Sequence, residues 1–201
     1  MTTMEFHIAG AAPGTPRRAM IDSQLRTSGV NEPWVLAAMA ALPREDFVPE
    51  AQKAAAYIDR AVPLGNGRYL AAPLVHGKML AAAEPAKTDK VLLVTSGSTY
   101  LAALLGPLVG ALTQVDAADV ANGIAGAPYG LIIIDGAIEQ LPDALVGALA
   151  DDGRIVSGLV DRGVTRLALG RKAAGAVSFV ALSDLGIPVL PEFAAPKGWS
   201  F

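Results

Sequence analysis

Val-Leu-Leu-Val-Thr-Ser-Gly-Ser-Thr-Tyr, at residues 91–100, is the stretch that decides how this chain folds. An apolar run, a turn of small residues and the start of a helix follow one another, and a second apolar run ends at Asp116. Small residues at such a turn let backbone N–H groups approach a ligand, and an acid at the end of the next strand accepts hydrogen bonds from a ribose diol. The pattern therefore predicts half of a nucleotide-cofactor site.

The composition limits the classes of protein to be considered. A chain of 201 residues with 52% apolar content suits a single compact domain. The net charge of −3 offers no broad basic surface, so we do not expect nucleic acid as a partner. Cysteine is absent, and histidine occurs only as His7 and His76, which excludes disulfides and zinc sites built from thiolates or several histidines. We expect no metal site.

Two segments bear on targeting. Residues 1–16 are interpreted as a flexible arm, because Glu5 and His7 stand where a secretion signal needs a basic flank and an apolar core. Residues 91–115 carry no charge over a length that could span a membrane. The polar turn at 95–99 and the helix-breaking Gly106-Pro107 favour strand, loop, helix and strand instead. We therefore expect no membrane partner and a cytoplasmic location.

The pattern along the rest of the chain predicts a single α/β domain over residues 17–201. Residues 17–88 are predicted to be helices and turns, and residues 89–201 a sheet whose strands alternate with helices. The predicted strands are 91–94, 111–115, 131–134, 154–159, 166–170 and 177–182, with residues 188–201 as a final strand. The first four are continuous apolar runs, which is typical of parallel strands covered on both faces.

Three groups of motifs, in this order, resemble the protein-L-isoaspartate O-methyltransferase family over most of the chain. Residues 20–30 are similar to its opening M-x-x-Q-L-x-x-x-G-I/V, and residues 35–39 to its V-L-x-A-M. Residues 43–50 match P-R-E-x-F-V-P-E, while 56–59 and 63–65 match A-Y-x-D and P-I/L-G. No single motif is specific, but their sequence and spacing together are.

The resemblance implies a Rossmann-like, S-adenosylmethionine-dependent methyltransferase fold with an N-terminal helical segment. The family methylates the L-isoaspartyl carboxylate of damaged proteins, after which the ester collapses to a succinimide. Residues 17–88 would then form the substrate side and residues 89–201 the cofactor side. The implied partners are S-adenosylmethionine and proteins or peptides that contain isoaspartyl residues.

The cofactor turn departs from the family pattern V-L-E/D-I-G-T/S-G-S-G-Y. Gly97, Ser98 and Tyr100 match it and are candidate cofactor-binding residues, whereas threonine replaces glycine at 95 and 99 and Leu93 replaces the acid. A β-branched residue where the backbone needs close approach or positive φ costs on the order of 1–3 kcal/mol. We therefore expect weakened binding of S-adenosylmethionine.

Two further departures affect the acceptor and the sheet. Ala71 stands where the family has a serine that it treats as catalytic, and Tyr69 stands where a threonine is usual. Loss of one orienting hydroxyl costs about ten- to a thousand-fold in rate. The short connection after Asp116 leaves room for one helical crossover, so the family's edge strand and one wall of the adenine pocket are predicted to be missing.

Four candidate residues have two interpretations each. Asp116 either holds a ribose or caps the following helix, and Asp135 either faces a ligand at the sheet edge or caps its strand. His76 either contacts the cofactor or lies on a helix surface. Asp59, a candidate catalytic residue, either touches substrate or pairs with Arg60 at the surface.

The sequence leaves two functions open. The first is an active or weakly active methyltransferase of this family, and the second is a catalytically inactive member that keeps the fold as a binding or regulatory module. The intact N-terminal motifs, Gly97 and Asp116 favour the first, and Ala71 with the lost glycines favours the second. Methylation of another small acceptor would need the cofactor site but not the missing serine.

Overall fold

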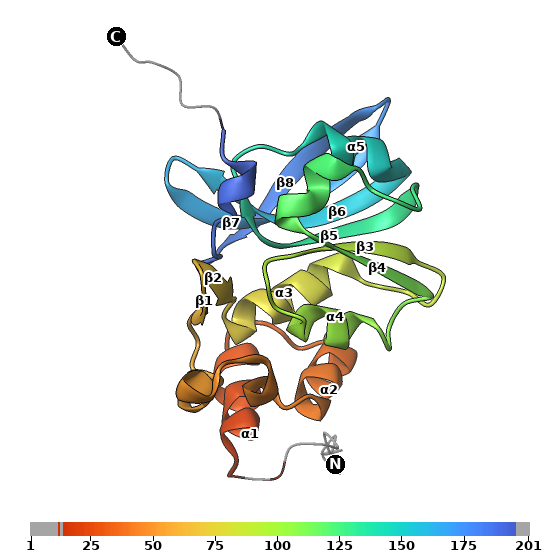
Figure 1. Ribbon diagram of the computed structural model, residues 1–201. Helices are drawn as coiled ribbons and strands as arrows, with labels where there is room; N and C mark the ends of the chain where they lie inside the picture. Colours follow the sequence, from red (N-terminus) through yellow and green to blue (C-terminus); the bar gives the residue numbers. More distant parts are fainter. Residues whose placement is uncertain (1–11, 13, 196–201) are drawn as a thin grey trace.

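A computed structural model of the chain describes residue 12 and residues 14–195, and a six-stranded sheet lies at its centre (Figure 1). The strand order is β4-β3-β5-β6-β7-β8. The strands are β3 (Lys90–Thr95), β4 (Ala111–Asp116), β5 (Tyr129–Ile138), β6 (Leu149–Asp161), β7 (Val164–Ala173) and β8 (Ala176–Asp184). β4, β3, β5 and β6 run parallel, while β7 and β8 are added by antiparallel pairing. The predicted α/β fold is confirmed.

Each of the six predicted strands lies inside an observed one, and β4 is an edge strand, as the short connection after Asp116 predicted. Within the described residues that connection forms only the short 3-10 helix η4 (Ala117–Asn122). The expectation that β4 is covered on both faces was wrong, since its residues are partly or fully exposed. With no strand beyond it, β4 meets solvent along one side.

Both faces of the inner strands are buried, because successive side chains of a strand point to opposite faces. In β3, Val91 and Leu93 join one apolar cluster, while Leu92 and Val94 join the other. Helices α3 (Pro73–Ala83) and α4 (Tyr100–Leu105) cover the first face, and η4 with α5 (Asp143–Ala148) covers the second (Figure 1). The strand ends are thereby fixed as a platform for side chains.

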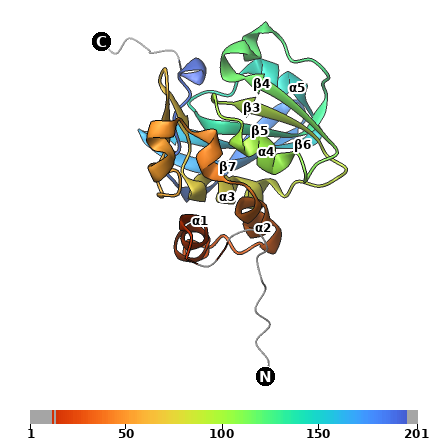
Figure 2. The same cartoon turned by 60° about the horizontal axis from the view of Figure 1, so that its bottom comes forward.

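We also expect from the sequence that the N-terminal helices pack across the carboxyl ends of the strands, which is wrong for the helices at 16–20 and 33–41 (Figure 2). These elements are α1 (Pro16–Met20), η1 (Ile21–Leu25), α2 (Pro33–Ala41), η2 (Arg44–Phe47) and η3 (Glu50–Ala55). α1 and α2 form a further layer beneath α3 (Figure 2). Gly77 permits this, because a Cβ there would lie 3.3 Å from the methyl carbons of Val30.

The hairpin of β1 (Val62–Gly65) and β2 (Arg68–Leu70) reaches the carboxyl ends of the strands instead. Its turn at 65–67 has positive φ at all three residues, which suits the sequence Gly-Asn-Gly. Arg68 follows this turn directly and contacts Asp116 at the end of β4. The hairpin therefore borders the predicted cofactor turn, and η2 contacts the same turn through Phe47 and Tyr100.

The C-terminal segment returns to the sheet after β8. Ala137 donates its backbone N–H to Pro188, and Leu190 donates to Ala137, both at 2.8 Å. The predicted final strand is thus reduced to one bridge, followed by the 3-10 helix η5 (Pro191–Phe193). Residues 1–11 and 13 of the predicted arm, and Trp199 and Phe201 of the predicted strand, lie outside the described residues.

Over the part of the chain that the structure describes, no helix has the length and apolar character needed to cross a membrane. The uncharged stretch at 91–115 is divided among β3, α4 and β4, as its turn and its Gly-Pro pair predicted.

Gly136 and Gly130 offer a matched test of how the C-terminal segment is seated, because both lie in β5. A Cβ on Gly136 would lie 2.5 Å from Cγ of Leu190, whereas one on Gly130 would meet nothing within 4 Å. We expect Gly136→Ala to lower the free energy of unfolding by about 1–3 kcal/mol through overpacking. Gly130→Ala should be neutral or stabilise by up to about 1 kcal/mol. Urea unfolding measures both, and equal effects would contradict the packing argument.

Candidate functional site

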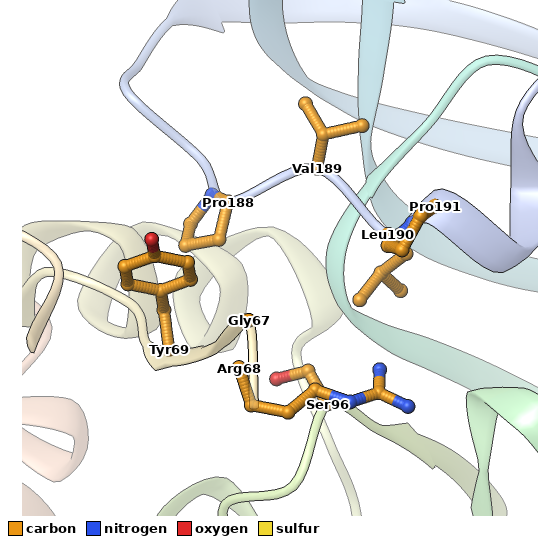
Figure 3. A pocket seen from close by; sticks show the side chains of 8 residues that line it. All are labelled: Gly67, Arg68, Tyr69, Ser96, Pro188, Val189, Leu190 and Pro191. Atoms are coloured by element: carbon orange, nitrogen blue, oxygen red, sulfur yellow. The ribbon is translucent and has the colours of Figure 1, made fainter. Parts of the chain in front are cut away.

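The carboxyl ends of three strands lie side by side. Thr95 of β3 pairs with Asp116 of β4, and Val94 pairs with Ile134, which places Asp135 at the same level of β5. The turn after β3, the β1–β2 hairpin and the C-terminal segment surround a cavity at these ends (Figure 3). The empty volume of the cavity is about 200 Å³, and this volume includes open solvent at its mouth.

The turn after β3 is free of the backbone strain that its threonines were expected to cause. Gly97, with φ of +89°, is the residue of this turn that has positive φ. Thr99 has φ of −99°, and the Thr95 hydroxyl lies 3.3 Å from the carbonyl oxygen of Val115 as a donor. The expectation of positive φ at the threonines was wrong, because that conformation is confined to Gly97, whereas crowding of a cofactor by their side chains stays a prediction.

Ser98 and Tyr100 are buried parts of the turn. The Ser98 hydroxyl accepts a hydrogen bond from the backbone N–H of Tyr100 at 3.2 Å. The Tyr100 ring packs edge-on against Phe47 at 5.1 Å and lies 5.4 Å from His76, between centroids. Burial raises the pKa of the Tyr100 phenol. Tyr100 holds the turn against the N-terminal segment, the Ser98 hydroxyl bonds within the turn, and contact of either residue with a cofactor stays a prediction.

Asp116 caps the helix that follows it, which is one of its two interpretations. Its Oδ1 accepts a hydrogen bond from the backbone N–H of Ala118 at 3.0 Å, so it caps η4. The same oxygen lies 3.3 Å from Nη2 of Arg68. Its role toward a ribose stays a prediction.

His76 and Asp135, which the sequence could place only separately, are connected with Arg44 by a buried series of hydrogen bonds. Nη1 of Arg44 lies 3.1 Å from Nδ1 of His76, and Nε2 of His76 lies 3.0 Å from Oδ1 of Asp135. All three residues are at most 2% exposed. His76 is therefore not on a helix surface, and both of its ring nitrogens are engaged. Any contact of His76 or Asp135 with a cofactor stays a prediction.

The chemistry of arginine determines the direction of both hydrogen bonds that connect Arg44, His76 and Asp135. A guanidinium group only donates, so Nδ1 of His76 accepts from Arg44 and the proton lies on Nε2, which donates to Asp135. Burial lowers the pKa of Arg44, and the charge of Asp135 is among the influences that oppose this. The imidazole thus connects a buried cation to a buried anion, as isolated charges there would be very costly.

Arg44 also holds the substrate-side segment in place. It donates through Nε to the carbonyl of Ala56 at 2.7 Å, and through Nη2 to the carbonyl of Ala71. Its guanidinium carbon lies 4.8 Å from the centroid of the Tyr100 ring. Sequence analysis did not select Arg44 as a functional residue, although its place in the Pro-Arg-Glu motif was a signal that could have found it.

Ala71 and Asp59, the two candidate catalytic positions, lie in different surroundings. Ala71 is 2% exposed and precedes α3, with its carbonyl fixed by Arg44. Asp59 is exposed and forms no ion pair with Arg60 among the described residues. Tyr69 is 42% exposed and lines the cavity. The catalytic roles of both candidates stay predictions.

Tyr57, from the Ala-Tyr motif, is the centre of a second network. Its hydroxyl donates to Glu45 and accepts hydrogen bonds from Nε of Arg17 at 2.9 Å and from the backbone N–H of Arg44 at 3.2 Å. Burial, followed by the hydrogen bond to Glu45, raises the pKa of Tyr57 to about 12. This network fixes the backbone from which the Arg44 side chain extends.

The comparison with known proteins agrees with the motifs. A family model described as protein-L-isoaspartate(D-aspartate) O-methyltransferase (PCMT) matches residues 15–124. The chain is 33% identical to the protein-L-isoaspartate O-methyltransferase of Koribacter versatilis, over 84% of this chain and 87% of that relative. It is 31% identical to the enzyme of the same name from Methanoculleus marisnigri, over 91% of this chain and 93% of that relative.

Two solved structures share the fold. One is a putative protein-L-isoaspartate O-methyltransferase from Plasmodium falciparum in complex with S-adenosyl-L-homocysteine. It has a TM-score of 0.66 and 16% identity, and the match covers 88% of this chain and 98% of that one. Another protein-L-isoaspartate O-methyltransferase structure has a TM-score of 0.68 and 13% identity, with 89% and 67% covered. At such identities the likeness shows the fold alone.

Truncation of His76 tests the buried hydrogen bonds that connect Arg44, His76 and Asp135. We expect His76→Ala to lower the free energy of unfolding by about 3–5 kcal/mol, because it leaves Arg44 and Asp135 buried without their shared partner. His76→Gln should lose less, since an amide can accept from one partner and donate to the other. Urea unfolding measures both variants. A loss below about 1 kcal/mol in His76→Ala would show that the two charges find other partners.

The Tyr57 network predicts a loss of stability at high pH. The pKa of about 12 in the folded state lies above the ordinary value of 10, so the folded protein retains a proton that the unfolded chain has released. The stabilisation is complete below pH 10 and is lost as the pH rises to about 12. We expect the free energy of unfolding to fall more steeply over this range in the native chain than in Tyr57→Phe. Parallel pH profiles from urea unfolding would contradict this assignment.

Proposed function

The chain belongs to the protein-L-isoaspartate O-methyltransferase family, and we propose that it transfers a methyl group from S-adenosylmethionine to L-isoaspartyl carboxylates of damaged proteins. The observation that carries this proposal is the turn at Gly97 beside Asp116, bordered by the hairpin that leads to Ala71. A backbone turn and an acid at neighbouring strand ends suit a nucleoside cofactor. The partners would be cytoplasmic proteins or peptides that contain isoaspartyl residues.

The proposal assigns roles to residues on both sides of the cavity. Gly97 and Ser98 would present the backbone to the cofactor, and Asp116 would accept hydrogen bonds from its ribose. On the acceptor side, Tyr69 lines the cavity, and Arg44 fixes the carbonyl of the buried Ala71 two residues further along the chain. Methyl transfer is a displacement at carbon that depends on alignment, so a rigid acceptor segment favours it.

Arg68 occupies part of the proposed cofactor site in the arrangement that the structure describes. Its side chain lies against Gly97, and its guanidinium group contacts Asp116. Binding of the cofactor to these two residues therefore requires Arg68 to move. Since an occupied site and an absent hydroxyl at Ala71 both oppose turnover, a catalytically inactive binding or regulatory module is the second candidate function.

A methyl-transfer assay separates the two functions. With radiolabelled S-adenosylmethionine and an isoaspartyl peptide, we expect transfer by the native chain to be slow. Ala71→Ser should raise it by about ten- to a thousand-fold through the restored hydroxyl. Combining Ala71→Ser with Tyr69→Thr should raise it further by opening the entrance.

The same peptide with an ordinary aspartyl residue is the control for acceptor specificity, and it should remain unmethylated. Rapid native transfer that neither substitution changes would show that another group orients the acceptor. Absence of methyl transfer by the native chain and both variants at saturating cofactor would favour the binding or regulatory module.

A further inference from the structure

Arg68 crosses the turn at which the cofactor is proposed to bind. A Cβ on Gly97 would lie 3.2 Å from Cγ of Arg68 and 3.4 Å from its Cβ, so the arginine stem rests directly on the Gly97 backbone. Figure 3 shows the side chain extended beside Ser96, below the segment that carries Leu190 and Pro191. The backbone that the sequence predicts as a cofactor contact is therefore covered by a side chain of the same protein.

The Arg68 guanidinium group is held by two carboxylates from distant parts of the chain. Nη2 lies 3.3 Å from Oδ1 of Asp116 and 2.7 Å from Oε1 of Glu192 in η5. The side chains of Arg68 and Glu192 are only 23% and 22% exposed. Charge-assisted hydrogen bonds are stronger than neutral ones, and partial burial reduces their screening by salt. Arg68 is thus anchored at its stem by the turn and at its end by two acids.

A cofactor at this edge would need the two features that Arg68 occupies, the open backbone at Gly97 and the carboxylate of Asp116. Building on the proposed function, we propose that Arg68 is an internal occupant of the cofactor site and competes there with S-adenosylmethionine. Glu192 is the second carboxylate of the site, and it becomes available to the cofactor when Arg68 leaves. Neither residue was a candidate in the sequence.

Displacement of Arg68 requires no unfolding of the sheet. The side chain begins on a two-stranded hairpin whose turn is glycine-rich, and its stem can rotate about several single bonds. Because the two occupants exclude each other, the apparent cofactor affinity equals the intrinsic affinity multiplied by the fraction of molecules in which Arg68 is displaced. An open fraction of about one tenth would weaken the apparent affinity about ten-fold.

Calorimetry with S-adenosylhomocysteine tests the competition directly, using the full-length native chain, Arg68→Ala and a control. Arg171→Ala is the matched control, because Arg171 is an exposed arginine on β7, opposite Arg154 near the amino end of the parallel strands. We expect Arg68→Ala to bind at least about ten-fold more tightly than the native chain and Arg171→Ala to bind equally to it. Equal affinity of Arg68→Ala and the native chain would overturn the proposal and leave the proposed function intact.

A salt titration of the native chain gives a second measurement that needs no variant. Rising ionic strength weakens the partly exposed pairs of Arg68, so the native affinity should increase with salt. The affinity of Arg68→Ala should not increase. A native affinity that stays constant or falls overturns the proposal, and absence of binding in every protein overturns both it and the proposed function. Tight binding by Arg68→Ala without methyl transfer would support the internal occupant and count against turnover.

Discussion

The buried charge of Arg44 is the constraint on which the arrangement of the site depends. A guanidinium group without solvent contact must find hydrogen-bond acceptors, and those of Arg44 are the carbonyls of Ala56 and Ala71 and the imidazole of His76. Through His76 the charge is connected to Asp135 at the end of the central strand β5. The substrate-side segment is thereby fixed to the sheet by polar contacts as well as by apolar packing.

The two arginines at the site divide it into a rigid part and a movable part. Arg44 is wholly buried, and removing a partner would leave an uncompensated charge, so the Ala71 backbone that it holds has little freedom. Arg68 is partly exposed on a hairpin, where breaking an ion pair costs far less. A site that opens on the cofactor side while its acceptor side stays fixed follows from this difference in burial.

The sheet could be predicted from the sequence because its strands are local apolar runs, and the missing edge strand because the connection after Asp116 is short. The contact of Arg68 with Glu192 and the hydrogen bonds that connect Arg44 to Asp135 through His76 could not be predicted. Each of these contacts joins residues that are far apart in the sequence. The family model matches residues 15–124 and therefore ends before β5 and the C-terminal segment. Motifs located the turn and the hairpin but carried no information on what lies between them.

The threonines of the cofactor turn show why a lost glycine does not by itself mean a lost site. Within this turn, positive φ occurs at Gly97, where glycine is present, and neither Thr95 nor Thr99 has positive φ. Leu93, which replaces the family's acid, is fully buried in the apolar cluster on the α3 face, where a carboxylate without a partner would be costly. The turn is therefore compatible with its sequence, and access to it depends on the side chain that covers it.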